Sequence, residues 1–298
     1  HRVDRRQRQM CIRDRRSVGV YAQDDAASLH ARQADEAVAL PGRGVPAYLD
    51  GVQLIAIARE QGCEAIHPGY GFLAENADFA EQCAEAGITL IGPGAETLRL
   101  FGDKAAARAL AARCQVPLVQ GTAQAVSLEA AKAFMASLQG SGVMIKALSG
   151  GGGRGMRAVT DPATLEAAYA RCQSEARAAF GNDAVYVEQL VESARHIEVQ
   201  VLGDGSGVVS HLWERDCTLQ RRHQKLVEFA PAPGLDPALR DRIIDSAMTL
   251  AAAVNYRGIG TFEFLVEPDQ DRSYFMEANP RVQVGHTVTA QVTGVALV

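Results

Sequence analysis

Acidic and amide side chains near the C-terminus have the spacing of a metal site. Glu263 stands between Phe262 and Phe264, so the two-residue period of a β-strand puts the acid on one face and the rings on the other. Glu277 and Asn279 share a face of the next predicted strand. Two carboxylates and an amide oxygen on neighbouring antiparallel strands suit Mg²⁺, which binds through carboxylates and substrate phosphates. The alternative is an exposed polar strand face.

A lysine followed by glycines forms a candidate phosphate site. Lys146 lies on a predicted strand at 142–147, and LSGGGGRGMR follows at 148–157. Four successive glycines argue against a helix interior, whereas backbone N–H groups beside an ammonium can bind an anion closely. The order is neither that of a Walker loop nor that of a dinucleotide-binding GxGxxG loop. A linker or a floppy lid is the alternative.

A third candidate site would bind an oxyanion. Arg281, Gln283 and Gly285 continue the parity of Asn279, and a fixed guanidinium beside a carboxamide can hold a planar oxyanion. The segment RDCTLQRRHQK, ending at Lys225, adds a dense polar cluster. This segment lacks the interleaved aromatic residues of a nucleic-acid surface, so an anion site is the favoured interpretation.

Length and composition narrow the class of protein. A chain of 298 residues with 47% hydrophobic and 22% charged residues is long enough for two globular domains. No apolar run approaches the roughly 20 residues that span a bilayer, which predicts a soluble protein without a membrane partner. The six cysteines are scattered without metal-ligand spacing, which favours the cytoplasm.

The arginine-rich residues 1–16 differ in composition from the rest of the chain. They predict an extraneous or disordered leader. A basic arm for nucleic acid is the alternative, but no basic face continues downstream, and no nucleic-acid partner is expected.

The remaining sequence alternates predicted strands and helices. Strands at 17–22, 65–69 and 88–93 enclose helices at 47–62 and 77–87, which predicts a parallel sheet covered by helices, with ligands at the strand carboxyl ends. Further helices are predicted at 102–117, 126–140, 162–181 and 235–254. Further strands are predicted at 184–191, 196–204 and 207–216, with a hairpin at 260–281.

Taken in order, the motifs HPGYGFLAEN, GDK, IKA with GGGGRGM, VEQLV, RHIEVQVLGD, ERDCTLQRRHQK, GTFEFL and EANPRVQVGHTVT resemble the biotin carboxylase family of ATP-grasp enzymes. The resemblance covers about residues 17–298. It implies an α/β fold: an incomplete parallel-sheet N-terminal domain at 17–101 that lacks its first strand and helix, then an ATP-grasp domain at 102–298. A mobile glycine-rich lid is expected over about 118–190, and the family's C-terminal domain is expected to be absent.

The resemblance also implies a reaction and its partners. In this family ATP and bicarbonate give carboxyphosphate, and the carboxyl group then moves to biotin on a carrier protein or domain. A carboxyltransferase passes it to an acceptor such as acetyl-CoA, propionyl-CoA, pyruvate or urea. The implied cofactors are ATP and Mg²⁺ or Mn²⁺, with biotin as the carrier-bound substrate, and a homodimer is possible.

Residue roles follow from the matched motifs. The positions matched to the nucleotide site are Lys104, Lys146, Gly150, Gly151, Gly152, Gly153, Glu188, Val191, His196, Gln220, His223 and Leu265. The positions matched to the metal ligands are Glu263, Glu277 and Asn279. The positions matched to the bicarbonate pocket are Lys225, Arg281, Gln283 and the backbone of Val284.

One departure from the family pattern concerns catalysis. Where the family has QVEH, this chain reads Gln283-Val284-Gly285-His286, so the glutamate expected to deprotonate bicarbonate is missing. A positioned general base contributes about 10² to 10⁴ in rate, which predicts ATP binding with crippled carboxylation. The alternatives are a fragment or pseudoenzyme that binds ATP, and another ATP-grasp ligase such as a carbamoyl-phosphate synthase subunit.

Overall fold

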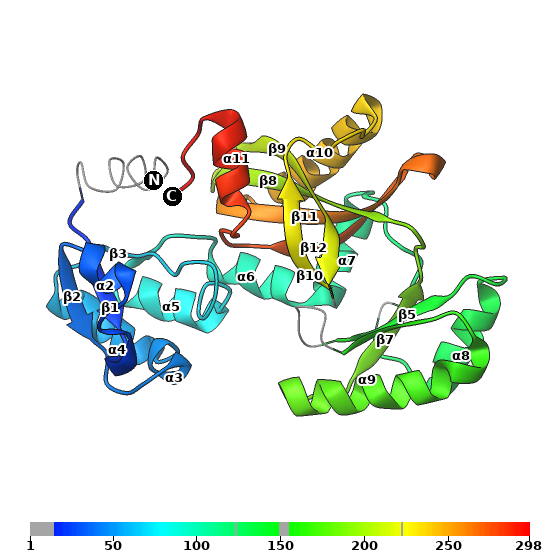
Figure 1. Ribbon diagram of the computed structural model, residues 1–298, viewed down its shortest axis with the longest axis horizontal. Helices are drawn as coiled ribbons and strands as arrows, with labels where there is room; N and C mark the ends of the chain where they lie inside the picture. The colour runs from blue at the N-terminus through cyan, green and yellow to red at the C-terminus, as the bar shows by residue number, and fades with distance from the viewer. Residues whose placement is uncertain (1–14, 123, 149–154, 222) are drawn as a thin grey trace.

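The computed structural model describes residues 15–122, 124–148, 155–221 and 223–298, which form three parts (Figure 1). The N-terminal part pairs β1 (Val18–Tyr21) with β2 (Glu36–Ala39), and β3 (Ala65–Ile66) with β4 (Thr89–Leu90), both in parallel. Its helices are α2 (Leu29–Gln33), α3 (Val45–Tyr48), α4 (Gly51–Glu60), α5 (Ala77–Glu85) and α6 (Ala95–Gly102), with a 3₁₀ turn η1 (Gln23–Asp25).

Parallel pairing was expected here, but the described strands form two separate pairs rather than one sheet. The helix predicted at 47–62 is divided into α3 and α4. Asp50 separates them because its side chain accepts a hydrogen bond from the Gln53 N–H and caps α4.

A second part, which we call the arm, projects from the molecule (Figure 1). It contains α8 (Leu128–Ser137), β5 (Val143–Ala147), β6 (Met156–Val159), α9 (Leu165–Phe180) and β7 (Val185–Gln189), with a 3₁₀ turn η2 (Pro162–Thr164). The strands are antiparallel in the order β6-β5-β7. The arm buries a hydrophobic cluster of its own, which includes Ile145, Leu165, Cys172 and Val187.

The central part is a five-stranded antiparallel sheet in the order β10-β9-β8-β11-β12. Its strands are β8 (Arg195–Asp204), β9 (Val209–Arg221), β10 (Gln224–Phe229), β11 (Arg257–Glu267) and β12 (Arg272–Asn279), with a 3₁₀ turn η3 (Pro268–Gln270). One face packs on α7 (Lys104–Arg113) and α10 (Pro237–Ala252), and α11 (His286–Thr293) contacts β9. The strand predicted at 207–216 is β9, which continues through the polar segment to Arg221, and Gln224 and Lys225 begin β10.

Every helix among the described residues is too short or too polar to span a bilayer. The described cysteines are free thiols, and each part of the molecule holds one that is completely buried: Cys83 in the N-terminal part, Cys172 in the arm and Cys217 on β9.

Candidate functional site

A cleft of about 1160 Å³ is lined by residues of the arm and of the polar face of the central sheet. Gly150, Gly151, Gly152 and Gly153 lie outside the described residues. All the other predicted site positions line this cleft: Lys104, Lys146, Glu188, Val191, His196, Gln220, His223, Lys225, Glu263, Leu265, Glu277, Asn279, Arg281, Gln283, Val284 and Gly285. The structure therefore brings these residues together in one cleft, and their individual roles are predictions.

The hairpin of β11 and β12 places the candidate metal ligands side by side. Glu263 is the direct cross-strand partner of Glu277. Asn279 pairs with Thr261, which lies two residues before Glu263 on β11. Phe262 and Phe264 are buried in the core beneath the sheet, which confirms the predicted alternation between rings and acid.

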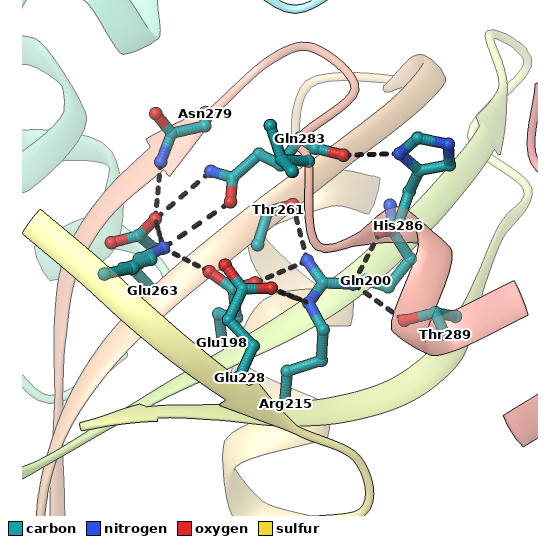
Figure 2. Close-up of polar contacts among 12 residues, drawn as sticks. Glu198, Gln200, Arg215, Glu228, Thr261, Glu263, Asn279, Gln283, His286 and Thr289 are labelled. Atoms are coloured by element: carbon teal, nitrogen blue, oxygen red, sulfur yellow. Dashed lines mark hydrogen bonds and ion pairs between the residues drawn. The ribbon is translucent and has the colours of Figure 1, made fainter. Parts of the chain in front are cut away.

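Glu263 is the centre of a hydrogen-bond network (Figure 2). Its Oε1 accepts bonds from Lys225 Nζ at 2.7 Å, Asn279 Nδ2 at 2.8 Å and Gln283 Nε2 at 3.2 Å. Its Oε2 lies 2.6 Å from His196 Nε2. Burial disfavours the charge of Glu263, but His196 and the Lys225 ammonium outweigh it and hold the pKa of this carboxyl below its usual range.

The pKa of the neighbouring Glu277 is shifted in the opposite direction. Burial and the charge of Glu263 raise its pKa. Two adjacent carboxylates, one ionised and one whose charge is disfavoured, together with the Asn279 amide, form an oxygen-donor set that fits a divalent cation such as Mg²⁺.

At the base of the arm, Glu188 joins two cations. Lys146, 8% exposed, forms an ion pair with Glu188, which also accepts a bond from Arg108 Nη1 at 2.6 Å. Burial opposes the charge of Lys146, but Glu188 outweighs it, so the pKa of Lys146 is raised. Lys104 Nζ donates to the Ala147 carbonyl at 3.3 Å, and burial lowers its pKa. Two ammonium groups therefore face the cleft where β5 ends.

Lys225 belongs to a network of buried ion pairs. Its ammonium pairs with Glu198 as well as Glu263, and these carboxylates raise the pKa of Lys225 in spite of its burial. Glu198 Oε1 also accepts from Arg215 Nε at 2.5 Å. Arg215 is 0% exposed and donates further bonds to Gln200 at 2.8 Å and Thr289 at 2.7 Å (Figure 2).

Glu198 and Arg108 were not predicted, and Arg215 was included only as the first residue of the polar segment RDCTLQRRHQK, without a role of its own. A signal for Glu198 was present in HIEVQV, where His196, Glu198 and Gln200 alternate with apolar residues that enter the core. Arg108 had no sequence signal, because its partner Glu188 comes from another element.

The predicted oxyanion pocket lies at the end of β12. Arg281 Nη2 donates to Asn279 Oδ1 at 3.1 Å, and Arg281 Nε lies 3.0 Å from Glu75 Oε2 of the N-terminal part. Gln283 is buried, Val284 is exposed, and Gly285 is the N-cap residue of α11. These two contacts hold the Arg281 guanidinium in place.

Two family models match the chain. The model of the biotin carboxylase N-terminal domain matches residues 1–98, a span that includes the arginine-rich segment set apart in the sequence analysis. The model described as the carbamoyl-phosphate synthase L chain ATP-binding domain matches residues 103–298.

Relatives and solved structures agree with these matches. Pyruvate carboxylase of Bacillus subtilis is 51% identical over 95% of this chain, and that of Aspergillus terreus is 50% identical over 95%. A biotin carboxylase structure from Campylobacter jejuni is 42% identical, has a TM-score of 0.92, and is matched over 98% of this chain and 65% of its own.

The chain belongs to the biotin carboxylase family of ATP-grasp proteins. The N-terminal match and the identity of the relatives favour this family over the carbamoyl-phosphate synthases. The expected α/β fold with an ATP-grasp domain is confirmed. The chain spans 25% of the length of the Bacillus protein and 24% of the Aspergillus protein.

Proposed function

We propose that this chain carries out the ATP-dependent carboxylation of biotin held on a carrier protein or domain. The observation that carries the proposal is one cleft that joins two lysines suited to phosphate, an oxygen-donor pair suited to Mg²⁺, and an oxyanion pocket. ATP and bicarbonate would give carboxyphosphate and ADP, and the carboxyl group would then pass to biotin.

Each group in the cleft has a task in this reaction. Lys104 and Lys146 bind phosphate oxygens. Glu263, Glu277 and Asn279 hold Mg²⁺ or Mn²⁺, which when bound neutralises phosphate charge. The bicarbonate ligands are Lys225, Arg281, Gln283 and the Val284 backbone.

Solved relatives support this ligand set. The 2-oxoglutarate carboxylase domain of Hydrogenobacter thermophilus, 40% identical with a TM-score of 0.92, was solved as a dimer with MgADP, ADP and bicarbonate. The scattered free cysteines favour the cytoplasm, and by analogy with the carboxylase relatives we infer that the chain works with a biotin carrier and a carboxyltransferase. The pyruvate carboxylase relatives favour pyruvate as the final acceptor, which the carboxyltransferase would select.

The first test is the binding of Mg·ATP measured by calorimetry. Lys146→Ala removes a buried ammonium, and each charge-assisted hydrogen bond contributes about 1.5–3 kcal/mol, so the Kd should rise by at least about tenfold. Lys132→Ala is the matched control, because Lys132 is exposed on α8 and pairs with Glu166. Equal affinity in Lys146→Ala and the unaltered chain would contradict the nucleotide site.

A second candidate function is favoured by one residue, Gly285. A member of the family that binds nucleotide but is impaired in catalysis would lack the base at this position. It would bind Mg·ATP without releasing ADP in response to bicarbonate, whereas the first proposal requires that release.

A further inference from the structure

The carboxylate of Glu228 fills the space beside Gly285. A Cβ atom built on Gly285 would lie 1.9 Å from Glu228 Oε2 and 3.0 Å from Arg215 Nε. The Gly285 backbone, with φ −62° and ψ −10°, is one that any residue adopts. A side chain at position 285 would therefore have to displace the end of the Glu228 side chain, while the backbone would accept it.

Glu228 reaches the cleft because β10 is irregular. The pairing of β10 with β9 shifts register between Lys225 and Val227, and again between Val227 and Phe229. In a regular strand, residues three apart face opposite sides. Here Lys225 and Glu228 are both partly buried and both line the cleft.

The Glu228 carboxyl has unused capacity to accept a proton. Its Oε2 is buried without a hydrogen-bond partner, while its side chain keeps 17% exposure. Arg215 Nε is 3.9 Å away, and this guanidinium donates instead to Glu198, Gln200 and Thr289 (Figure 2). Burial and the charge of Glu198 raise the pKa of Glu228, against the opposing effect of the Arg215 charge.

We propose that Glu228 is the general base that accepts the proton of bicarbonate in this chain, in place of the glutamate missing at position 285. The inference rests on the proposed function. The bicarbonate O–H bond breaks and its proton passes to the Glu228 carboxylate. The freed oxygen forms a bond to the γ-phosphorus of ATP, and the bond from that phosphorus to the bridging oxygen breaks, leaving its electron pair on ADP. The products are carboxyphosphate and ADP.

The test compares Glu228→Gln with the unaltered chain in two assays, Mg·ATP affinity and bicarbonate-dependent ADP formation. Loss of a general base should lower the rate of ADP formation by about 10² to 10⁴ and leave the Kd of Mg·ATP unchanged. Glu60→Gln, at the exposed end of α4, is the matched control and should behave as the unaltered chain. Glu228→Asp keeps the carboxylate and should retain more activity than Glu228→Gln.

A pH profile separates a base from a packing residue. The rate in the unaltered chain should fall on the acid side as Glu228 takes up a proton, and the residual rate of Glu228→Gln should lack this limb. The groups that act on Glu228 are Glu198 from β8, Arg215 and Cys217 from β9, Lys225 from its own strand and Glu263 from β11. A limb that persists in Glu228→Gln belongs to one of these groups and overturns the proposal.

Other outcomes are equally decisive. A Glu228→Gln variant that forms ADP at the rate of the unaltered chain overturns the assignment of the base. An unaltered chain that binds Mg·ATP but forms no ADP with bicarbonate also overturns it. Failure of the unaltered chain to bind Mg·ATP is a different result, because it contradicts the proposed function itself and the base assignment with it.

Discussion

Gly285 and Glu228 form a pair of positions that compete for one space. The carboxyl oxygen of Glu228 stands where the first side-chain carbon of residue 285 would be. A glutamate introduced at position 285 therefore has to displace Glu228, which is the far end of a flexible side chain. Overpacking of this kind costs about 1–3 kcal/mol.

We expect Gly285→Glu alone to raise bicarbonate-dependent ADP formation by less than about tenfold and to lower the urea midpoint, because the space is filled and a base is already present. In a Glu228→Ala background, which opens the space, Gly285→Glu should restore about 10² or more of the lost rate. Gly285→Gln in the same background is the control and should restore nothing. A gain of 10² or more from Gly285→Glu alone would instead favour the impaired-catalysis candidate.

At this scale the sequence was informative where alternation is regular. Glu263 was predicted from its place between Phe262 and Phe264, and β11 keeps that alternation although its pairing with β12 shifts register between Glu263 and Phe264. Glu228 was not predicted. It lies on the same side of β10 as Lys225 because of two register shifts, and no sequence pattern predicts those shifts.

Among the elements, α7 and β7 are joined by one buried ion pair. The Arg108 and Glu188 side chains are only 14% and 6% exposed, and Arg108 also donates to the Val119 carbonyl at 3.0 Å. The pair fixes the base of the arm against the helix that begins at Lys104.

Arg108→Met should lower the free energy of unfolding by about 1.5–3 kcal/mol, because Glu188 loses a charge-assisted hydrogen bond while Lys146 still balances its charge. Urea denaturation measures this loss. The control is Arg113→Met at the exposed end of α7, which should change stability by less than about 0.5 kcal/mol. A loss below about 1 kcal/mol in Arg108→Met would contradict a structural role for the pair.

Sequence patterns predicted most elements of the arm and the central sheet but missed several short ones. The helix α11 was missed because HTVTAQVT is rich in β-branched residues, which have low helix propensity. Its position is set by tertiary contacts, including the bond from Arg215 to Thr289. The helix predicted at 47–62 was divided because a capping aspartate outweighs the apolar pattern around it.

Over the whole molecule, hydrophobic burial is divided among separate clusters. The central cluster joins the sheet to α7 and α10, the arm cluster contains only residues of the arm and its flanks, and smaller clusters hold the N-terminal part together. The cleft lies between the first two clusters. Parts that share little buried surface can open separately.

The rate at which each buried thiol reacts with a reagent can report the local unfolding of the part of the molecule around it. Burial raises the pKa of Cys172 to about 11 and also raises those of Cys83 and Cys217, so a thiol reagent, which needs an accessible thiolate, must wait for the surrounding part to open. Labelling rates, followed by peptide mass spectrometry, would then measure the rate at which each part opens.

Leu165→Ala, in the arm cluster, should accelerate labelling of Cys172 and leave Cys217 at its original rate, because the lost packing of about 2–5 kcal/mol is local to the arm. Leu250→Ala, in the central cluster, should do the reverse. Equal acceleration at both thiols in either variant would mean that arm and sheet open as one unit. If the two parts open separately, the labelling rates of Cys172 and Cys217 in a single sample report the opening of the two sides of the cleft.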